Sequence, residues 1–317
     1  MKRFALSLAL AACLTLPGGV SAQSRETLEL TDAQMEELVR RSYQYVAMFN
    51  VNNKFALDPD NPMTTGGYNR AFANTELADH TLQAIARPNN DTLYTIALID
   101  VTEEPVVLEM PAFDSTYVSL MVTAYDHYVN IPMSTTKGDF DEPATMLFYS
   151  ERTPGYDGEP VEGIDRVMET TGDFVSAVFR VMPHAAEPER LERNLAAMRS
   201  VDVEPLSEFL GKADKEQHVR SWGSPLGISR NLDLREDTAR IPPYGSDFEV
   251  FEDRFIEVMQ FVVNHTTFDP NDELDAGLLA VLGPLGIAPG NTFDPDTAPE
   301  IDGDALRAVA QRVAAEE

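Results

Sequence analysis

The sequence predicts an α+β fold, with an antiparallel, sandwich-like β core that is flanked by helices and followed by a helical C-terminal portion. Apolar residues recur at helical spacing towards both ends of the chain, whereas short apolar or alternating segments fill the region from about 88 to 185. The links between these segments are too short for βαβ crossovers. The sequence also lacks the G-x-G-x-x-G and P-loop motifs of nucleotide-binding parallel sheets.

The first residues have the pattern of a signal peptide. Lys2 and Arg3 precede the apolar stretch Phe4–Leu16, and Val20-Ser21-Ala22 places small residues at the positions that signal peptidase recognises before its cleavage site. Cleavage there gives a mature protein that starts at Gln23. We therefore expect residues 1–22 to direct export to the periplasm or the medium.

An alternative for the same segment is a lipid anchor. Leu10-Ala11-Ala12-Cys13 resembles a lipobox, in which Cys13 would be lipidated. Cys13 is the only cysteine in the chain, so a mature protein starting at Gln23 has no disulfide and no cysteine nucleophile or ligand.

We expect residues 23–317 to form a single domain that begins with a helix. Thr31-x-x-Gln34 is a capping-box pattern, and apolar residues then follow at helical spacing up to Phe49. After a loop rich in Gly, Pro and Asn, a second helix is predicted over residues 75–86.

The β region contains five predicted strands. Leu93–Ile99 is almost continuously apolar, which is typical of a strand covered on both faces, and Val106–Met110 alternates with one polar residue. The other three strands are predicted at Thr116–Val129, Met146–Tyr149 and Phe174–Met182.

Helical patterns return from about 187 to 317. Apolar residues repeat at helical spacing around Leu195, after the capping box Ser246-x-x-Glu249, around Leu278, and over Asp302–Ala315. The acidic run Asp269–Asp275 lacks the glycine and the final glutamate of a calcium loop, so we interpret it as a helix N-terminus.

The charge restricts the classes of partner. The chain has 53 acidic and 24 basic residues and a net charge of −29. Without a cluster of Lys and Arg, such a chain is repelled by nucleic acids and by anionic membranes. We expect no nucleic-acid partner and no transmembrane span in the mature chain. A monomer and a homo-oligomer both stay open.

Known catalytic and metal motifs are absent. The sequence contains neither H-E-x-x-H nor G-x-S-x-G, and its five histidines are not spaced as metal ligands. We therefore expect no metal and no cofactor. His127 is the histidine of most interest, because Tyr125-Asp126-His127-Tyr128 ends a predicted buried strand.

The turn before the first predicted strand is unusually polar. Arg87-Pro88-Asn89-Asn90-Asp91-Thr92-Leu93-Tyr94 places turn-forming residues directly before apolar ones. A turn that caps the strand is sufficient to explain this segment. Alternatively, Asn90, Asp91 and Tyr94 lie at the mouth of a pocket and serve in hydrogen bonding or proton transfer.

These motifs resemble the bacterial domain-of-unknown-function family numbered 1254. The similar segments are Pro88–Tyr94, Pro105–Leu108, Tyr117-Val118-Ser119, Asp126-x-x-x-Asn130, Phe174–Arg180, where Phe179 replaces a glycine of the family, and Leu285–Asp294. The resemblance extends over roughly residues 30–297. It implies an α+β unit found in exported or envelope proteins, and it implies no established reaction.

Members of that family often carry a second β-sandwich domain after this one. We expect this chain to be a stand-alone version without it. The residues on the family-like motifs are Asn90, Asp91, Tyr94, Tyr117, Asp126 and Arg180.

Three functional hypotheses follow. The first is an exported protein that binds a small neutral or cationic molecule in a polar and aromatic pocket, with Asn90, Asp126, His127 and Arg180 as binding residues. The second is a hydrolase or lyase in which Asp91 is the base, Tyr94 or Tyr117 donates a proton, and Arg180 stabilises negative charge. The third is an envelope interaction or scaffold protein.

Overall fold

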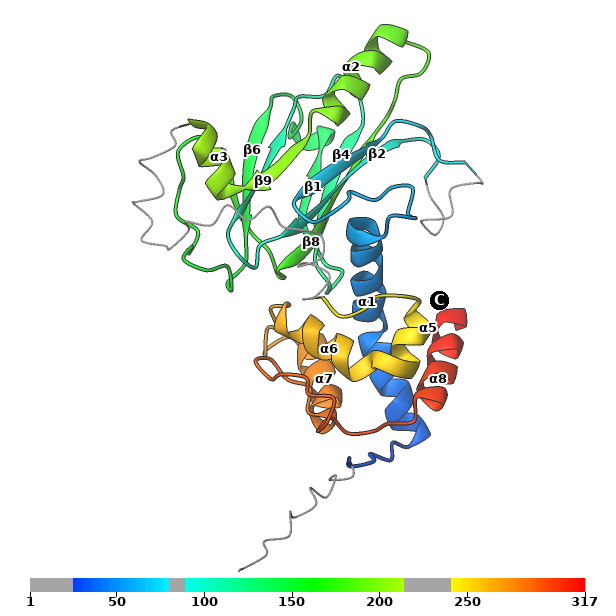
Figure 1. The fold of residues 1–317 in the computed structure, drawn as a ribbon. Coiled ribbons are helices and arrows are strands. Elements are labelled where there is room, and N and C mark those ends of the chain that lie inside the picture. Colours follow the sequence, from blue (N-terminus) through cyan, green and yellow to red (C-terminus); the bar gives the residue numbers. More distant parts are fainter. Residues whose placement is uncertain (1–24, 80–88, 214–240, 317) are drawn as a thin grey trace, which may run out of the picture.

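A long helix, α1 (Asp32–Leu57), connects the two halves of the molecule (Figure 1). The computed structural model describes residues 25–79, 89–213 and 241–316. The first half of α1 packs among the C-terminal helices, and its other end reaches the β-sheets. The predicted capping box is confirmed, because Thr31 Oγ1 accepts the Gln34 N–H and Gln34 Oε1 accepts the Thr31 N–H.

The first sheet has five strands in the order β1-β2-β8-β4-β5, and every neighbouring pair is antiparallel. The strands are β1 (Arg70–Asn74), β2 (Leu93–Asp100), β4 (Val118–Thr123), β5 (Val129–Ser134) and β8 (Phe174–Val181). The strands predicted around Ile96 and Val178 are therefore confirmed almost residue for residue.

The second sheet has four strands in the order β7-β6-β3-β9. They are β3 (Val106–Met110), β6 (Ala144–Tyr149), β7 (Arg166–Glu169) and β9 (Asp202–Pro205). The pair β6–β7 is parallel and the other two pairs are antiparallel. The predicted antiparallel sandwich is thus confirmed, with one parallel pair added at an edge.

The two sheets pack face to face through one apolar core. Alternate residues of β2 and β8, such as Ala97 and Phe179, share this core with Leu108 of β3 and Phe148 of β6. The opposite face of β2, which carries Ile96, packs in a second core with α1 and the C-terminal helices. β2 is therefore covered on both faces, which explains why it is continuously apolar.

Helices cover the rest of the molecule. In the sandwich half, α2 (Pro188–Arg199) lies between β8 and β9 in the chain, and α3 (Leu206–Ala213) follows β9. The C-terminal group consists of α5 (Asp247–Glu249), the π-helical turn η2 (Val250–Arg254), α6 (Phe255–Asn264), α7 (Glu273–Leu282), η3 (Gly283–Leu285) and α8 (Gly303–Glu316). A 3₁₀ turn, η1 (Thr135–Lys137), follows β5, and η3 is a turn of the same kind.

Two of the C-terminal predictions concern caps, and both are confirmed. The Ser246 hydroxyl and the Glu249 side chain form the expected capping box. Asp272 caps α7 by accepting the N–H groups of Leu274 and Asp275, so the acidic run is a helix N-terminus. In the described part of the chain, no helix combines the length and apolar character that a membrane crossing needs.

Several predictions need correction. The predicted strand Thr116–Val129 is too long, because the chain turns after Thr123 and pairs with itself again from Val129 onwards. The predicted helix over 75–86 is wrong for residues 75–79, which are not helical. There the Asn74 side chain accepts the Glu76 N–H, a local bond that competes with a helix start. Residues 80–86 and the predicted signal peptide lie outside the described residues.

The predicted β region is also too narrow. β1 and β9 lie before and after residues 88–185, and inside this range β7 and β5 beyond Val129 were not predicted. β1, β7 and β9 are short and mixed in polarity, so neither alternation nor a continuous apolar run marks them.

Candidate functional site

A pocket of about 450 Å³ lies between the second half of α1 and the face of the first sheet that points away from the sandwich core. This volume is within the range of small-molecule sites. The walls are formed by Met48, Val51, Asn52 and Phe55 of α1, Tyr94, Ile96 and Leu98 of β2, Met121 and Thr123 of β4, Ser176, Val178 and Arg180 of β8, and by Asn89 and His127.

The sheet wall is built by the register of three strands. Side chains of one strand alternate between the two faces, so residues two apart share the pocket face. Tyr94 of β2 is the cross-strand partner of Arg180 on β8. The next row of the same face places Ile96, Val178 and Met121 side by side. The pocket face therefore has a polar row next to an apolar row.

The helix wall is built by one stripe of α1. Met48, Val51, Asn52 and Phe55 follow the spacing i, i+3, i+4 and i+7, which places them on one side of a helix. Val51 is 43% exposed and lies at the rim, whereas Asn52 is only 1% exposed. An amide is thus held inside a mainly apolar wall.

Two donor atoms of the pocket lining are buried without a hydrogen-bond partner among the described residues. They are Nε of Arg180 and Nδ2 of Asn52. The other polar groups in the lining differ from these two. The Tyr94 hydroxyl accepts the Asn89 N–H at 3.0 Å, and the Thr123 and Ser176 hydroxyls bond each other at 2.9 Å. An unpaired buried donor costs free energy, so these two atoms favour an acceptor from outside the protein.

The charge of the pocket is opposite to that of the chain. None of the described residues that line it is Asp or Glu, although the chain has 53 of them. Arg180 brings a permanent positive charge, and no described carboxylate forms an ion pair with it. The pocket is therefore a locally positive site in an acidic protein.

The predicted residues Asp126 and His127 separate at the turn after β4. His127 has a left-handed backbone, with φ of 64°, and its side chain lines the pocket. Asp126 is buried and accepts hydrogen bonds from the Thr171 hydroxyl and the Tyr128 N–H. Burial raises the pKa of Asp126, although these donors oppose the shift. Asp126 is not part of the pocket lining.

Three other predicted residues lie outside the lining. Asn90 and Asp91 are exposed in the turn before β2, where the Asp91 N–H donates to Asn89 Oδ1 at 2.7 Å. Tyr117 is 39% exposed, and its hydroxyl lies 3.3 Å from Ser119 Oγ. Of the seven predicted site residues, the pocket brings together Tyr94, His127 and Arg180.

Sequence reasoning missed the contribution of α1 to the site. The predicted apolar stripe of this helix ends at Phe49 and faces only the core. The predicted loop rich in Gly, Pro and Asn begins at Asn52, which is wrong, because α1 continues to Leu57. The available signal was an asparagine within a stripe of apolar residues at helical spacing, such as Met48 and Phe55.

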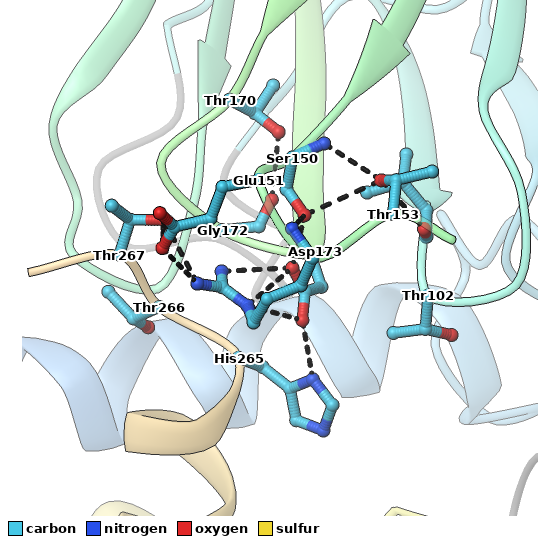
Figure 2. A network of polar contacts seen from close by, with 12 residues as sticks. Thr102, Ser150, Glu151, Thr153, Thr170, Gly172, Asp173, His265, Thr266 and Thr267 are labelled. Atoms are coloured by element: carbon cyan, nitrogen blue, oxygen red, sulfur yellow. Dashed lines mark hydrogen bonds and ion pairs between the residues drawn. The ribbon is translucent and has the colours of Figure 1, made fainter. Parts of the chain in front are cut away.

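A second polar cluster lies where the sandwich meets the C-terminal helices (Figure 2). Asp173, which is 2% exposed, accepts hydrogen bonds from three side chains. Ser150 Oγ donates at 2.6 Å, Arg152 Nε at 3.0 Å and His265 Nδ1 at 2.7 Å. Burial alone would raise the pKa of Asp173, but these donors outweigh burial and hold the pKa below its ordinary value. We call these four residues the joint.

The joint is reinforced by the backbone. The Asp173 N–H donates to the His265 carbonyl, and the Thr267 N–H donates to the Thr171 carbonyl. Gly172 permits this approach, because a Cβ there would lie 3.0 Å from the His265 carbonyl oxygen and 2.8 Å from the Ala124 Cβ. The Asp173–His265 pair has the form of a catalytic dyad, but its serine donates to the carboxylate instead of the imidazole. None of the four residues of the joint lines the pocket, so we assign the joint a structural role.

One group of three carboxylates could hold a cation among the described residues. Glu109 of β3 and Asp202 and Glu204 of β9 place oxygen atoms within 4.8 Å of one another. Oxygen ligands of this kind suit Ca²⁺ or Mg²⁺. Three carboxylates alone do not distinguish a cation site from an ordinary acidic surface, so no metal is assigned to them.

Residues 69–205 match the family described as "Protein of unknown function (DUF1254)". The resemblance predicted from the motifs is confirmed for this segment, which contains every strand from β1 to β9. Comparison with curated proteins gives no match. The pocket therefore combines strands of the matched segment with α1, which lies before it.

Two solved structures are similar to this chain. The VPA0106 protein from Vibrio parahaemolyticus is 20% identical, with a TM-score of 0.54 over 90% of this chain and 58% of its own. This identity supports a shared fold and nothing finer, and the chain spans a little over half the length of the Vibrio protein. An uncharacterised protein from Burkholderia cenocepacia is 11% identical over 52% of each chain, with a TM-score of 0.27.

Proposed function

We propose that this chain binds a small, largely apolar molecule in the pocket between α1 and the first sheet. The observation that carries the proposal is the composition of this pocket. Apolar side chains from α1, β2, β4 and β8 form most of its walls, and a few polar groups converge on it. This combination is typical of small-molecule sites.

Export is part of the proposal. Because the signal pattern of residues 1–22 lies outside the described residues, its test is chemical. The denatured mass of protein purified from its own host should correspond to a chain that begins at Gln23. A mass that fits a lipidated Cys13 at the N-terminus would support the lipid-anchored alternative.

The hydrolase or lyase alternative has less support. Its base, Asp91, is exposed and is absent from the pocket lining, whereas Tyr94 and Arg180 are part of that lining. A general base has to be within hydrogen-bond reach of the proton that it removes. Asp91 therefore has no evident role in a reaction of a ligand that is bound in the pocket.

A dye-binding experiment tests the proposal. N-phenyl-1-naphthylamine, an uncharged dye that fluoresces in apolar surroundings, should bind the wild-type protein at one saturable site. Val178→Trp should abolish the signal, since Val178 lies in the pocket wall. Val129→Trp is the control, because Val129 is 45% exposed and is not part of the lining. Equal binding by both variants would place the dye elsewhere and contradict the proposal.

A further inference from the structure

We propose that the ligand of this pocket is an amphipathic monocarboxylate, whose carboxylate binds at the Arg180–Tyr94 pair and whose apolar tail lies along α1. The inference rests on the proposed function and names the chemical class of its ligand. It replaces the neutral or cationic ligand that the sequence suggested.

The first argument is the position of the two polar side chains. Tyr94 and Arg180 are direct partners on neighbouring strands, and the Cβ atoms of such pairs lie about 4.5–5.5 Å apart. The Tyr94 hydroxyl accepts the Asn89 N–H, and it donates to no described residue. The hydroxyl hydrogen and Arg180 Nε, which has no described partner, therefore offer two donors from neighbouring strands on the same pocket face.

The second argument is charge. Arginine presents its N–H groups in a planar fork that fits a carboxylate. Since none of the described lining residues is acidic, a ligand anion meets no repelling negative charge among them. A phosphate would bring about two negative charges against one arginine in an apolar pocket, and an unpaired buried charge is costly. One arginine therefore favours a singly charged head.

The third argument is the apolar remainder of the wall. The row of Ile96, Val178 and Met121 lies directly beside the Tyr94–Arg180 row, and Met48 and Phe55 of α1 form the opposite wall. A ligand with an anionic end and an apolar body matches this arrangement, in which a polar row lies beside apolar walls. Nδ2 of Asn52, buried in the α1 wall, offers one further donor to an acceptor on the ligand.

The test uses three probes of equal length, namely octanoate, octan-1-ol and octylamine. Calorimetric titration of the full chain should show that octanoate binds at least about tenfold more tightly than octan-1-ol, because a hydrogen bond to a charged group is worth at least that factor. Octylamine should bind most weakly, since its ammonium meets the Arg180 guanidinium.

Variants locate the head group. Arg180→Gln should weaken octanoate binding about ten- to a hundredfold and octan-1-ol binding much less, because the hydroxyl of octan-1-ol carries no charge. Arg180→Lys should keep part of the preference, because it retains the charge but loses the fork. Arg199→Gln is the control, because it removes one exposed positive charge outside the pocket lining. Thermal unfolding of each variant establishes that it is folded.

The outcomes separate the two proposals. If octanoate and octan-1-ol bind equally, or if Arg180→Gln weakens both to the same extent, the pocket binds ligands but the carboxylate inference is overturned. Tighter binding of octylamine overturns it as well. If none of the three probes binds and the uncharged dye also fails to bind, both the inference and the proposed function fail.

Discussion

Arg152 and Arg180 lie in two contrasting regions of the molecule. In the joint, Arg152 is paired with the buried Asp173 and also with Glu151, at 2.8 Å. In the pocket, Arg180 projects from a strand into mainly apolar walls, and no described carboxylate pairs with it. An arginine that forms ion pairs with carboxylates of the same chain stabilises the fold. An arginine without such partners is available to bind a ligand. The predictions below test this contrast.

The largest effect is expected from the anion of the joint. Asp173→Ala leaves Arg152 without its buried partner, and breaking a buried ion pair costs about 3–5 kcal/mol. Urea denaturation should show a loss of this size in the free energy of unfolding. The exposed Asp91→Ala is the control and should change it by less than about 0.5 kcal/mol. A loss below about 1 kcal/mol for Asp173→Ala would contradict a structural role for the joint.

The two arginines can be compared by the same substitution. Arg152→Met should destabilise by about 3 kcal/mol, because the buried Asp173 loses its guanidinium partner. Arg180→Met should change stability by less than about 1 kcal/mol, because it removes a donor that has no partner among the described residues. Thermal and urea unfolding measure both. Equal losses would show that Arg180 is a structural residue like Arg152.

Neighbouring asparagines of α1 offer a smaller contrast of the same kind. Asn53 is fully buried and bonded twice, donating to the Phe49 carbonyl at 2.8 Å and accepting from the Tyr68 hydroxyl at 3.0 Å. Asn53→Leu should destabilise by about 2 kcal/mol. Asn52→Leu should be neutral or stabilising by about 1 kcal/mol, because the Asn52 amide nitrogen is buried and no described residue pairs with it. If the Asn52 variant loses as much stability as the Asn53 variant, Asn52 is bonded in the folded protein.

The smallest effect concerns pH and two buried aspartates. The folded-state pKa of Asp173 is lowered, so its stabilisation is complete above the unfolded-state pKa and is lost as pH falls through the folded-state pKa. The folded-state pKa of Asp126 is raised, so its charge becomes destabilising as pH rises through the folded-state pKa.

Asparagine variants measured from pH about 3 to 7 separate these two effects. Relative to wild type, Asp173→Asn should lose more stability as pH rises. Asp126→Asn should instead gain relative stability over the same range, because it cannot ionise. Urea midpoints at each pH provide the measurement, and parallel profiles for the two variants would contradict the assigned directions.

Much of the fold could be predicted because its strongest signals are local. A strand covered on both faces, such as β2, is continuously apolar, and capping boxes fix the starts of helices at Thr31 and Ser246. The short strands β1 and β9 could not be predicted, because their pairing depends on partners far away in the sequence.

The site could be predicted only in part for the same reason. Tyr94, His127 and Arg180 lie on motifs that stood out as polar residues beside apolar strands, and they line the pocket. Asp91 lies outside the pocket because of the conformation of the turn before β2. Asn52 lies in the pocket wall because of the way α1 crosses the sheet. Local sequence patterns predict neither of these packing relations.

The most direct test of the central claim is methyl NMR on protein labelled at its methionines, titrated with octanoate. Met48 and Met121 line the pocket, whereas Met146 is buried in the sandwich and Met259 among the C-terminal helices. We predict saturable shifts of the Met48 and Met121 methyl signals, while Met146 and Met259 stay unchanged. Shifts at all four, or none at Met48 and Met121, would contradict a ligand site between α1 and the sheet.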